Sequence, residues 1–290
     1  MTVDDRGELV AAVEAELGVE VRAAGPVTGG DINDAWRFET TAHGALFVKT
    51  RSDAPHGFYA AEAAGLEWLG EADALTVPDV VGVGDGEVRF LALSWVDSAL
   101  PAVDHDEVLG RGLARLHLAG ADSFGLRGGG FAGSLQLPNT PCDTWSEFYA
   151  TCRLEPLVAL CADAGVLPAS TVARVEAVIG RLDALVGPFE RPARLHGDLW
   201  AGNVMTGAGG HPVLVDPAAY GGHREVDLAM MRLFGGFSPA VFDAYDEAWP
   251  LAADARRRVP LWQLAPLLVH ARLFSGGYGA SVDAAARACL

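Results

Sequence analysis

The segment Leu195–Val204, with the sequence LHGDLWAGNV, constrains the fold more than any other part of the chain. Four residues separate a carboxylate, Asp198, from a carboxamide, Asn203. The glycines Gly197 and Gly202 let the backbone turn sharply beside both side chains. The segment therefore predicts a tight loop that presents two oxygen-bearing side chains at one place.

This pair of side chains suits the transfer of a phosphoryl group to an alcohol. That reaction needs a carboxylate to orient the hydroxyl and accept its proton, and an oxygen ligand to hold Mg²⁺ against the phosphates. The D-x-x-x-x-N spacing of kinase catalytic loops supplies both groups. We therefore predict that Asp198 is the catalytic base and that Asn203 is a Mg²⁺ ligand.

The residues that follow predict a hairpin. Val204 and Met205 precede a glycine-rich turn at Gly207–Gly210, and the apolar run Val213–Val215 ends at Asp216. A hairpin would return Asp216 to the mouth of the loop, where it would be the second Mg²⁺ ligand. The alternative is that Asp216 is an ordinary capping aspartate after a strand.

Lys49 is the only lysine among 21 basic residues, and the other 20 are arginines. A site that accepts a compact ammonium but not a planar guanidinium would keep its lysine, although chance survival is the alternative. Side chains alternate along the expected strand 45–49, so Lys49 can face a cleft and bind the phosphates of ATP.

A helical glutamate would hold this lysine in place. Glu62 lies 13 residues further on, in the expected helix 57–70, whereas Glu67 reads as a surface residue. The alternative is that Glu62 is also an ordinary solvent-facing residue. Gly29 and Gly30 lie between two expected strands and can bring backbone N–H groups close to phosphate, although a plain turn would look the same.

The stretch 91–97 would be the hinge between two lobes. Its backbone at Ser94, Trp95 and Val96 could hydrogen-bond adenine, and an ordinary edge strand is the alternative. Upstream of it the chain reads as β-rich, apart from helices at 4–17 and 57–70. We therefore expect an α+β fold with a small β-rich N-terminal lobe at 1–97 and a larger, mainly helical lobe at 98–290. The helices expected in the second lobe are 105–119, 144–163, 169–186, 225–234, 239–248 and 256–275.

Composition excludes several classes of protein. A net charge of −17 argues against a nucleic-acid surface, and the basic run 256–258 reads as a solvated helix face. No uncharged apolar run reaches 18 residues, so no membrane span is expected. The acidic N-terminus lacks the pattern of a signal peptide, which predicts a cytoplasmic protein. The four cysteines show no spacing that is typical of a zinc site.

These motifs resemble the fructosamine (ketosamine) kinase family, which is related to aminoglycoside and choline kinases. The resemblance runs almost from end to end of the chain. It rests most on the His196–Asn203 loop together with the later segments Val215–Ala218 and Arg224–Met230. Further matches lie at 29–33, 47–49, 62–67, 113–117, 131–139, 233–237 and 247–250.

The resemblance implies a two-lobed protein-kinase-like fold and an ATP- and Mg²⁺-dependent kinase. The acceptor would be the sugar 3-hydroxyl of a ketoamine, and the unstable product would release the amine, so the enzyme would act in deglycation. Asp227, with His196, would brace the catalytic loop, and Trp200 and Asn33 would line the acceptor side. Another acceptor, such as an aminoglycoside or choline, and a nucleotide-binding pseudokinase are the competing interpretations.

The chain departs from related patterns at three places. Many family members carry a glycine-loop cysteine that supports redox control, but this chain has Asp31 there. Gly197 replaces the catalytic-loop arginine of protein kinases, and Asp216-Pro217-Ala218 replaces their Asp-Phe-Gly. Without an arginine to receive a phosphate, we expect activity that needs no phosphorylation.

Overall fold

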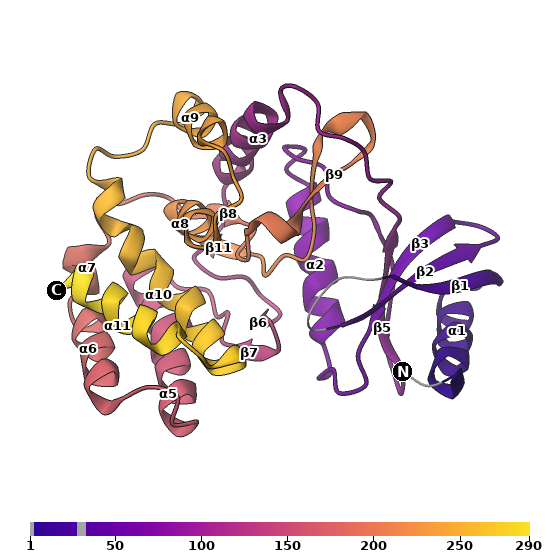
Figure 1. Cartoon of the computed structure of the whole chain (residues 1–290), viewed down its shortest axis with the longest axis horizontal. Helices are drawn as coiled ribbons and strands as arrows, with labels where there is room; N and C mark the ends of the chain where they lie inside the picture. The colour runs from indigo at the N-terminus through magenta and orange to yellow at the C-terminus, as the bar shows by residue number, and fades with distance from the viewer. Residues whose placement is uncertain (1–2, 28–32) are drawn as a thin grey trace.

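The chain folds into a sheet-containing part and a larger helical part, which meet along a cleft (Figure 1). A computed structural model describes residues 3–27 and 33–290. A β-rich first third followed by helices was expected, and the order of the elements confirms it. We propose that the boundary between the two lobes lies after Asp97, as the sequence suggests.

The first part is built on one antiparallel sheet of five strands in the order β1-β2-β3-β5-β4. The expected edge-strand alternative for the hinge is wrong, because β5 lies inside the sheet between β3 and β4. The strands are β1 (Val21–Val27), β2 (Asp34–Thr40), β3 (Gly44–Thr50), β4 (Val80–Asp85) and β5 (Arg89–Ser94).

A different helix packs against each face of the sheet. Helix α1 (Val3–Leu17) packs Leu9 and Val13 against Leu46 and Val48, which point to its side of β3. Helix α2 (Phe58–Gly70) covers the opposite face and packs against Leu91 and Leu93 of β5. The alternation expected for β3 is therefore confirmed, and it directs Lys49 toward α2 rather than α1.

The helical part contains one large core around Trp262 and a smaller core beside helix α3. Helices 225–234 and 239–248 begin and end at the predicted residues. The helices are α3 (His105–Ala119), α4 (Trp145–Tyr149), α5 (Glu155–Asp163), α6 (Ala169–Ile179), α7 (Leu182–Leu185), α8 (Glu225–Phe234), α9 (Pro239–Ala248), α10 (Ala255–Phe274) and α11 (Tyr278–Cys289).

Three short two-stranded sheets complete this part: β6 with β7, β8 with β11, and β9 with β10. The predicted hairpin after the catalytic loop is the pair β9–β10, and a bridge between Thr76 and Val213 ties it to the first part of the chain. The strands are β6 (Gly130–Ala132), β7 (Leu135–Leu137), β8 (Ala193–Leu195), β9 (Val204–Thr206), β10 (Pro212–Leu214) and β11 (Tyr220–Gly222).

The helix expected over 144–163 is present, but it is not a regular α-helix throughout, because a π-helical turn, η1 (Ala150–Leu154), interrupts it. Pro156 has no N–H to donate to the carbonyl of Cys152, so the regular α-helical ladder cannot continue there. The guanidinium of Arg153 donates to that carbonyl at 2.8 Å instead. The helix expected over 169–186 is likewise divided at Gly180, and the sequence did not reveal α11 or the pair β6–β7.

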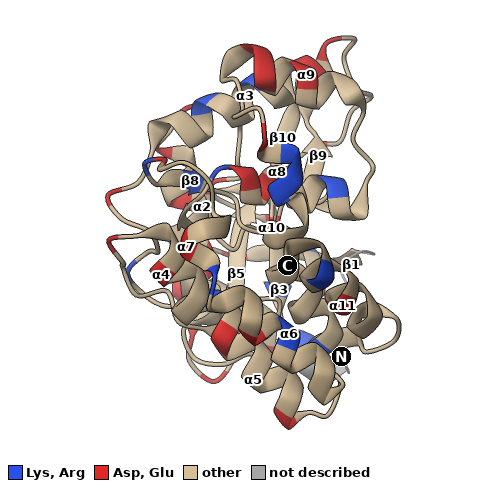
Figure 2. Cartoon of the chain, turned by 90° about the vertical axis from the view of Figure 1, so that its left-hand side faces the viewer, with Lys and Arg blue, Asp and Glu red and all other residues tan. Residues whose placement is uncertain are grey.

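Charged side chains are spread over many elements of the fold. In the view of Figure 2, the ribbon segments of acidic residues (red) and basic residues (blue) are scattered over several helices. Among the described residues, no helix is both long and apolar enough to cross a membrane.

Candidate active site

The predicted catalytic loop connects β8 to β9 and holds Asp198 and Asn203 together. The Asn203 side-chain amide donates to the Asp198 carbonyl at 2.8 Å and to its Oδ2 at 3.2 Å. Gly197 has φ of +82°, and a Cβ there would lie 2.1 Å from the carbonyl oxygen of Ala218. Any other residue at 197 would be strained and would also collide with backbone, so glycine is required for the loop to close.

A buried carboxylate, that of Asp227, holds the backbone of this loop in place. Asp227, on the first turn of α8, accepts hydrogen bonds from the backbone N–H of His196 at 2.8 Å and of Gly197 at 2.9 Å. His117 lies 3.2 Å from the same carboxylate and bonds Tyr245 with its other ring nitrogen. Burial alone would raise the pKa of Asp227, but the hydrogen bond and charge of His117 and the loop N–H groups hold it below its usual value.

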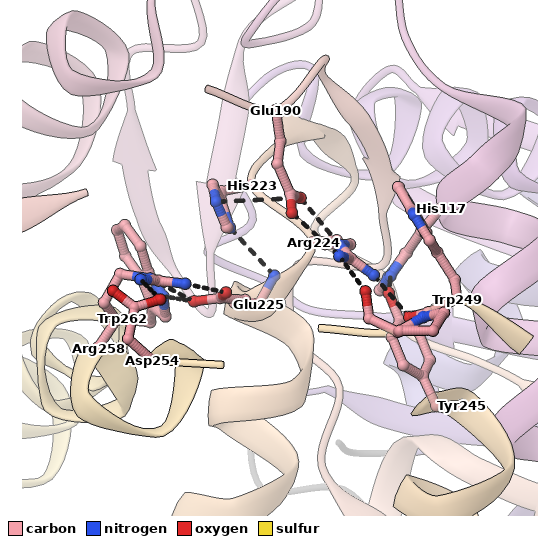
Figure 3. A network of polar contacts seen from close by, with 11 residues as sticks. His117, Glu190, His223, Arg224, Glu225, Tyr245, Trp249, Asp254, Arg258 and Trp262 are labelled. Atoms are coloured by element: carbon pink, nitrogen blue, oxygen red, sulfur yellow. Dashed lines mark hydrogen bonds and ion pairs between the residues drawn. The ribbon is translucent and has the colours of Figure 1, made fainter. Parts of the chain in front are cut away.

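The start of α8 is itself held by two ion pairs that extend to opposite sides (Figure 3). Arg224 donates to both carboxylate oxygens of Glu190, at 2.8 and 3.0 Å. Glu225 accepts two hydrogen bonds from Arg258, at 2.9 and 2.7 Å, and one from Trp262 Nε1 at 2.8 Å. These pairs fix the helix that carries Asp227.

The basic run 256–258 was expected to be a solvated helix face, and this is wrong for Arg258. Arg256 and Arg257 are exposed, as a solvated helix face predicts, but Arg258 is buried against Glu225. A buried guanidinium needs a carboxylate partner; Asp254 pairs with it from four residues earlier, and its buried partner Glu225 lies 33 residues away in the sequence. No local pattern in the sequence indicates this contact.

Lys49 joins the two parts of the protein at the cleft. Its side chain is 3% exposed, and its Nζ contacts Glu62 of α2 and lies 2.8 Å from Asp216 Oδ1. Burial by itself lowers the pKa of Lys49, but the two carboxylates outweigh it and raise the pKa to about 12. Lys49 therefore stays protonated, and the predicted choice of Glu62 rather than the exposed Glu67 as its neighbour agrees with this geometry.

Asp216 follows the hairpin, as expected, and its backbone has φ of +53°. A non-glycine residue in this left-handed region is uncommon, and such residues cluster at functional sites. Its carboxylate is 51% exposed and reaches Lys49 rather than a helix end, so the capping alternative does not describe it. The backbone carbonyl of Asp216 accepts from Asn203 at 3.4 Å, which links it to the catalytic loop.

The side-chain oxygens of Asn203 and Asp216 suit Mg²⁺ bound to a nucleotide. Asn203 uses its amide nitrogen for the protein contacts described above, which leaves its side-chain carbonyl oxygen available as a metal ligand. The described residues hold no cluster of three His, Cys, Asp or Glu side chains that could bind a metal alone. Mg²⁺ commonly binds through one or two protein oxygens and completes its shell with phosphates and water, so Asn203 and Asp216 suit it.

Asp198 combines burial with acidic neighbours. Burial raises the pKa of Asp198 to about 7, against the lowering effect of the Asn203 amide and with smaller contributions from Asp216 and Asp227. A carboxylate with a pKa near neutrality can accept a proton in a reaction that runs near pH 7.

These residues line one cleft of about 1050 Å³. Trp200 and Asn33 also line it, and their contact with the acceptor stays a prediction. Trp200 is 42% exposed, and its ring lies directly on Gly202, where a Cβ would approach it to 2.2 Å. Asn33 accepts a hydrogen bond from the Tyr59 hydroxyl at 3.0 Å. The cleft thus gathers Lys49, Glu62, Asp198, Asn203 and Asp216 with both of these side chains.

The other residues predicted to contact the nucleotide, which are those of the hinge and of the glycine-rich turn, have less support from the structure. Ser94, Trp95 and Val96 are not among the described residues that line the cleft. The backbone N–H groups of Ser94 and Trp95 already donate to Asp79 and Ala45, whereas no described residue accepts from the Val96 N–H. If this hinge binds adenine, Val96 is the residue with a free donor. Gly29 and Gly30 lie outside the described residues.

The helical end of the cleft carries an aromatic cluster that sequence reasoning missed. Phe234, His270, Phe274 and Tyr278 come from α8, α10 and α11 and all line the cleft. His270 and Phe274 are four residues apart on one helix face, which is the one local signal the sequence offered.

Comparison with known proteins identifies relatives along nearly the whole chain. The family model described as fructosamine kinase matches residues 8–290. A protein of Enterococcus faecium named probable ketoamine kinase is 36% identical over 263 residues, which cover 89% of this chain and 92% of that protein. A Thermus thermophilus protein of the same name is 38% identical over 257 residues, which cover 87% and 88%.

Solved structures agree with these matches. A crystal structure from Thermobifida fusca, provisionally named fructosamine-3-kinase, is 45% identical with a TM-score of 0.88, and covers 97% of this chain and 98% of that one. The choline kinase LicA of Streptococcus pneumoniae is 14% identical with a TM-score of 0.64 and covers 98% of both chains, so it shows a shared fold alone.

Proposed function

Because this chain belongs to the fructosamine kinase family and is therefore a phosphotransferase, we propose that it transfers the γ-phosphoryl group of ATP to the 3-hydroxyl of a ketosamine. The 3-phosphorylated product would then release its amine, which makes the reaction a step in deglycation. The observation that carries the proposal is the single cleft in which Lys49, Asp198, Asn203 and Asp216 converge.

In the proposed reaction, Asp198 orients the acceptor hydroxyl and takes up its proton as the oxygen attacks the γ-phosphorus. The bond between that phosphorus and the β–γ bridging oxygen breaks, and ADP leaves. Lys49, steadied by Glu62, would hold the phosphates of ATP as a compact cation. Bound Mg²⁺ would neutralise the charge that develops on the phosphates, with Asn203 and Asp216 as its protein ligands.

The charge distribution of the cleft favours ketosamines over aminoglycosides, which are polycations. The carboxylates among the described residues that line the cleft are Glu62, Asp198 and Asp216. All three are committed to Lys49, the metal or the acceptor hydroxyl in the proposed reaction. No further carboxylate in this lining would bind the additional ammonium groups of an aminoglycoside.

The pseudokinase alternative has less support. The base, metal and lysine positions are all present, and Lys49 lies 2.8 Å from Asp216. Activity should also need no activating phosphorylation, as expected from the sequence. The cytoplasmic location expected from the sequence stays a prediction.

The test is an assay of ADP release with ribulosyl-lysine, fructosyl-lysine, an aminoglycoside and choline as acceptors. We expect turnover with the two ketosamines and phosphate at the sugar 3-position of the product by NMR. Asp198→Asn should bind ATP almost normally and lose turnover. Turnover confined to choline or the aminoglycoside would reject the proposed acceptor, and near-normal kcat in Asp198→Asn would remove Asp198 from its role as the base.

A further inference from the structure

The aromatic cluster at the helical end of the cleft has a defined geometry. The ring of His270 lies 4.7 Å from Phe234, 5.3 Å from Phe274 and 5.1 Å from Tyr278, measured between ring centroids. These spacings are typical of aromatic rings in contact. Phe274 is nevertheless 48% exposed, so the cluster presents a ring to the cleft that the protein itself does not cover. We call these four residues the aromatic pocket.

The aromatic pocket carries no net charge. His270 Nδ1 lies 2.8 Å from the carbonyl oxygen of Pro266, which can only accept, so this nitrogen carries the proton. Burial holds the pKa of His270 below its usual value, so the ring is neutral near pH 7 and its Nε2 is an acceptor. No described residue donates to that Nε2. Val269 and Leu273, which line the cleft beside these rings, are apolar as well.

The aromatic pocket adjoins the reacting centre. His270 and Val269 line both the main cleft and a smaller cavity of about 60 Å³ behind it. Asp198 lines the same two spaces. A molecule whose hydroxyl reaches Asp198 would therefore extend its remaining part toward these rings. In a ketosamine, the amine on C1 and its substituent lie two carbons from the 3-hydroxyl.

We propose that the aromatic pocket binds the amine side of the acceptor and makes the enzyme selective for ketosamines of aromatic or apolar amines. This proposal rests on the proposed function and deepens it by naming the class of amine. The faces of Phe234 and Phe274 attract the protonated secondary amine and stack on an aromatic substituent. His270 Nε2 accepts the N–H of that amine, a role which a charged histidine could not perform.

The experiment compares two synthetic ketosamines that carry the same sugar, one made with benzylamine and one with methylamine. The wild-type enzyme should show kcat/KM for the benzyl compound about tenfold or more above that for the methyl compound, because only the former fills the aromatic pocket. Phe274→Ala should lower this ratio by about threefold to tenfold, which corresponds to the loss of one aromatic contact. Because Phe274 is half exposed, the variant should fold normally.

A matched control and a second variant separate the possible outcomes. Phe189 is 86% exposed and does not line the cleft, so Phe189→Ala should leave the ratio unchanged. His270→Phe keeps a ring but loses the acceptor, so it should lower kcat/KM for both compounds and keep most of the selectivity. Fructosyl-lysine within a protein should react more slowly than the benzyl compound.

The result that overturns the inference is equal kcat/KM for the two compounds, or a ratio that Phe274→Ala leaves unchanged. In that case the proposed function would stand, because both ketosamines are turned over. If neither ketosamine is turned over while choline or an aminoglycoside is, the proposed function fails and this inference fails with it.

Discussion

Replacement of Asp227 by asparagine tests whether the catalytic loop depends on a carboxylate beneath it. Asp227 accepts from the N–H groups of His196 and Gly197 and contacts His117; the contacts with His196 and His117 are buried, and the one with Gly197 is partly buried. Asparagine has nearly the same shape but offers one oxygen acceptor and one donor. One loop N–H would then face an NH₂ group instead of an acceptor.

The expected magnitude follows from these contacts. A hydrogen bond to a charged group contributes about 1.5–3 kcal/mol, and a buried N–H left unpaired costs about 1–3 kcal/mol. The two effects overlap in this variant, so we expect a loss of about 2–4 kcal/mol in the free energy of unfolding. For a chain of this length, about 2 °C in Tm corresponds to 1 kcal/mol, so Tm should fall by about 4–8 °C.

Activity should change as well, because Gly197 precedes Asp198 directly. A displacement of about 1 Å at a reacting group can cost about a hundredfold in rate. We expect kcat to fall about tenfold to a hundredfold, measured by ADP release well below the unfolding transition, with ATP affinity nearly unchanged. Asp243→Asn is the matched control, because Asp243 is exposed on α9 and makes the same change of charge. If Asp227→Asn had the same Tm and kcat as this control, the loop would not depend on the Asp227 carboxylate.

Three further variants probe other contacts. Lys49→Arg should reduce kcat/KM for ATP at least about a hundredfold in the same assay, because a guanidinium does not fit a 3% exposed site built for an ammonium; full activity would mean that the lysine is replaceable. Gly197→Ala should lower both Tm and kcat, since φ of +82° and the close Ala218 carbonyl exclude a Cβ, and an unchanged Tm would contradict this. Burial holds the pKa of His223 below its ordinary 6.5, so only the unfolded chain takes up its proton near that pH. The stability it contributes is complete above pH 6.5 and is lost as the pH falls, by at most about 1.4 kcal/mol per pH unit. His223→Gln should therefore lessen the drop in Tm between about pH 7.5 and pH 5.5, and an equal drop in both proteins would refute this.

The residues proposed to carry the chemistry were the part of the molecule whose positions were most predictable. Asp198 and Asn203 are close in sequence, and the turn at 207–210 returns Asp216 to them, so local patterns suffice to bring these three together. Strand alternation predicted that Lys49 faces the side opposite Leu46 and Val48, and these two residues pack in the core with α1. Glu62 was chosen over Glu67 because it lies in the first half of the expected helix, and it does contact Lys49.

The contacts that support the loop were not predictable in the same way. Arg224 and Glu190 are 34 residues apart, and Glu225 and Arg258 are 33 apart, so no helical or strand period relates them. The second pair depends on how α8 and α10 pack, and the first depends on where the segment between α7 and β8 lies, and a single sequence reveals neither. The aromatic pocket has the same origin, because its rings come from three separate helices.

The burial of Lys49 has a consequence for the chemical durability of the protein. Reducing sugars, acylating reagents and aldehydes react with amines that are unprotonated and open to solvent. The single lysine amine of this chain is neither, because it is buried between two carboxylates and its pKa is raised. An enzyme proposed to act on sugar adducts of amines therefore offers sugars no lysine side chain of its own on which such an adduct could form.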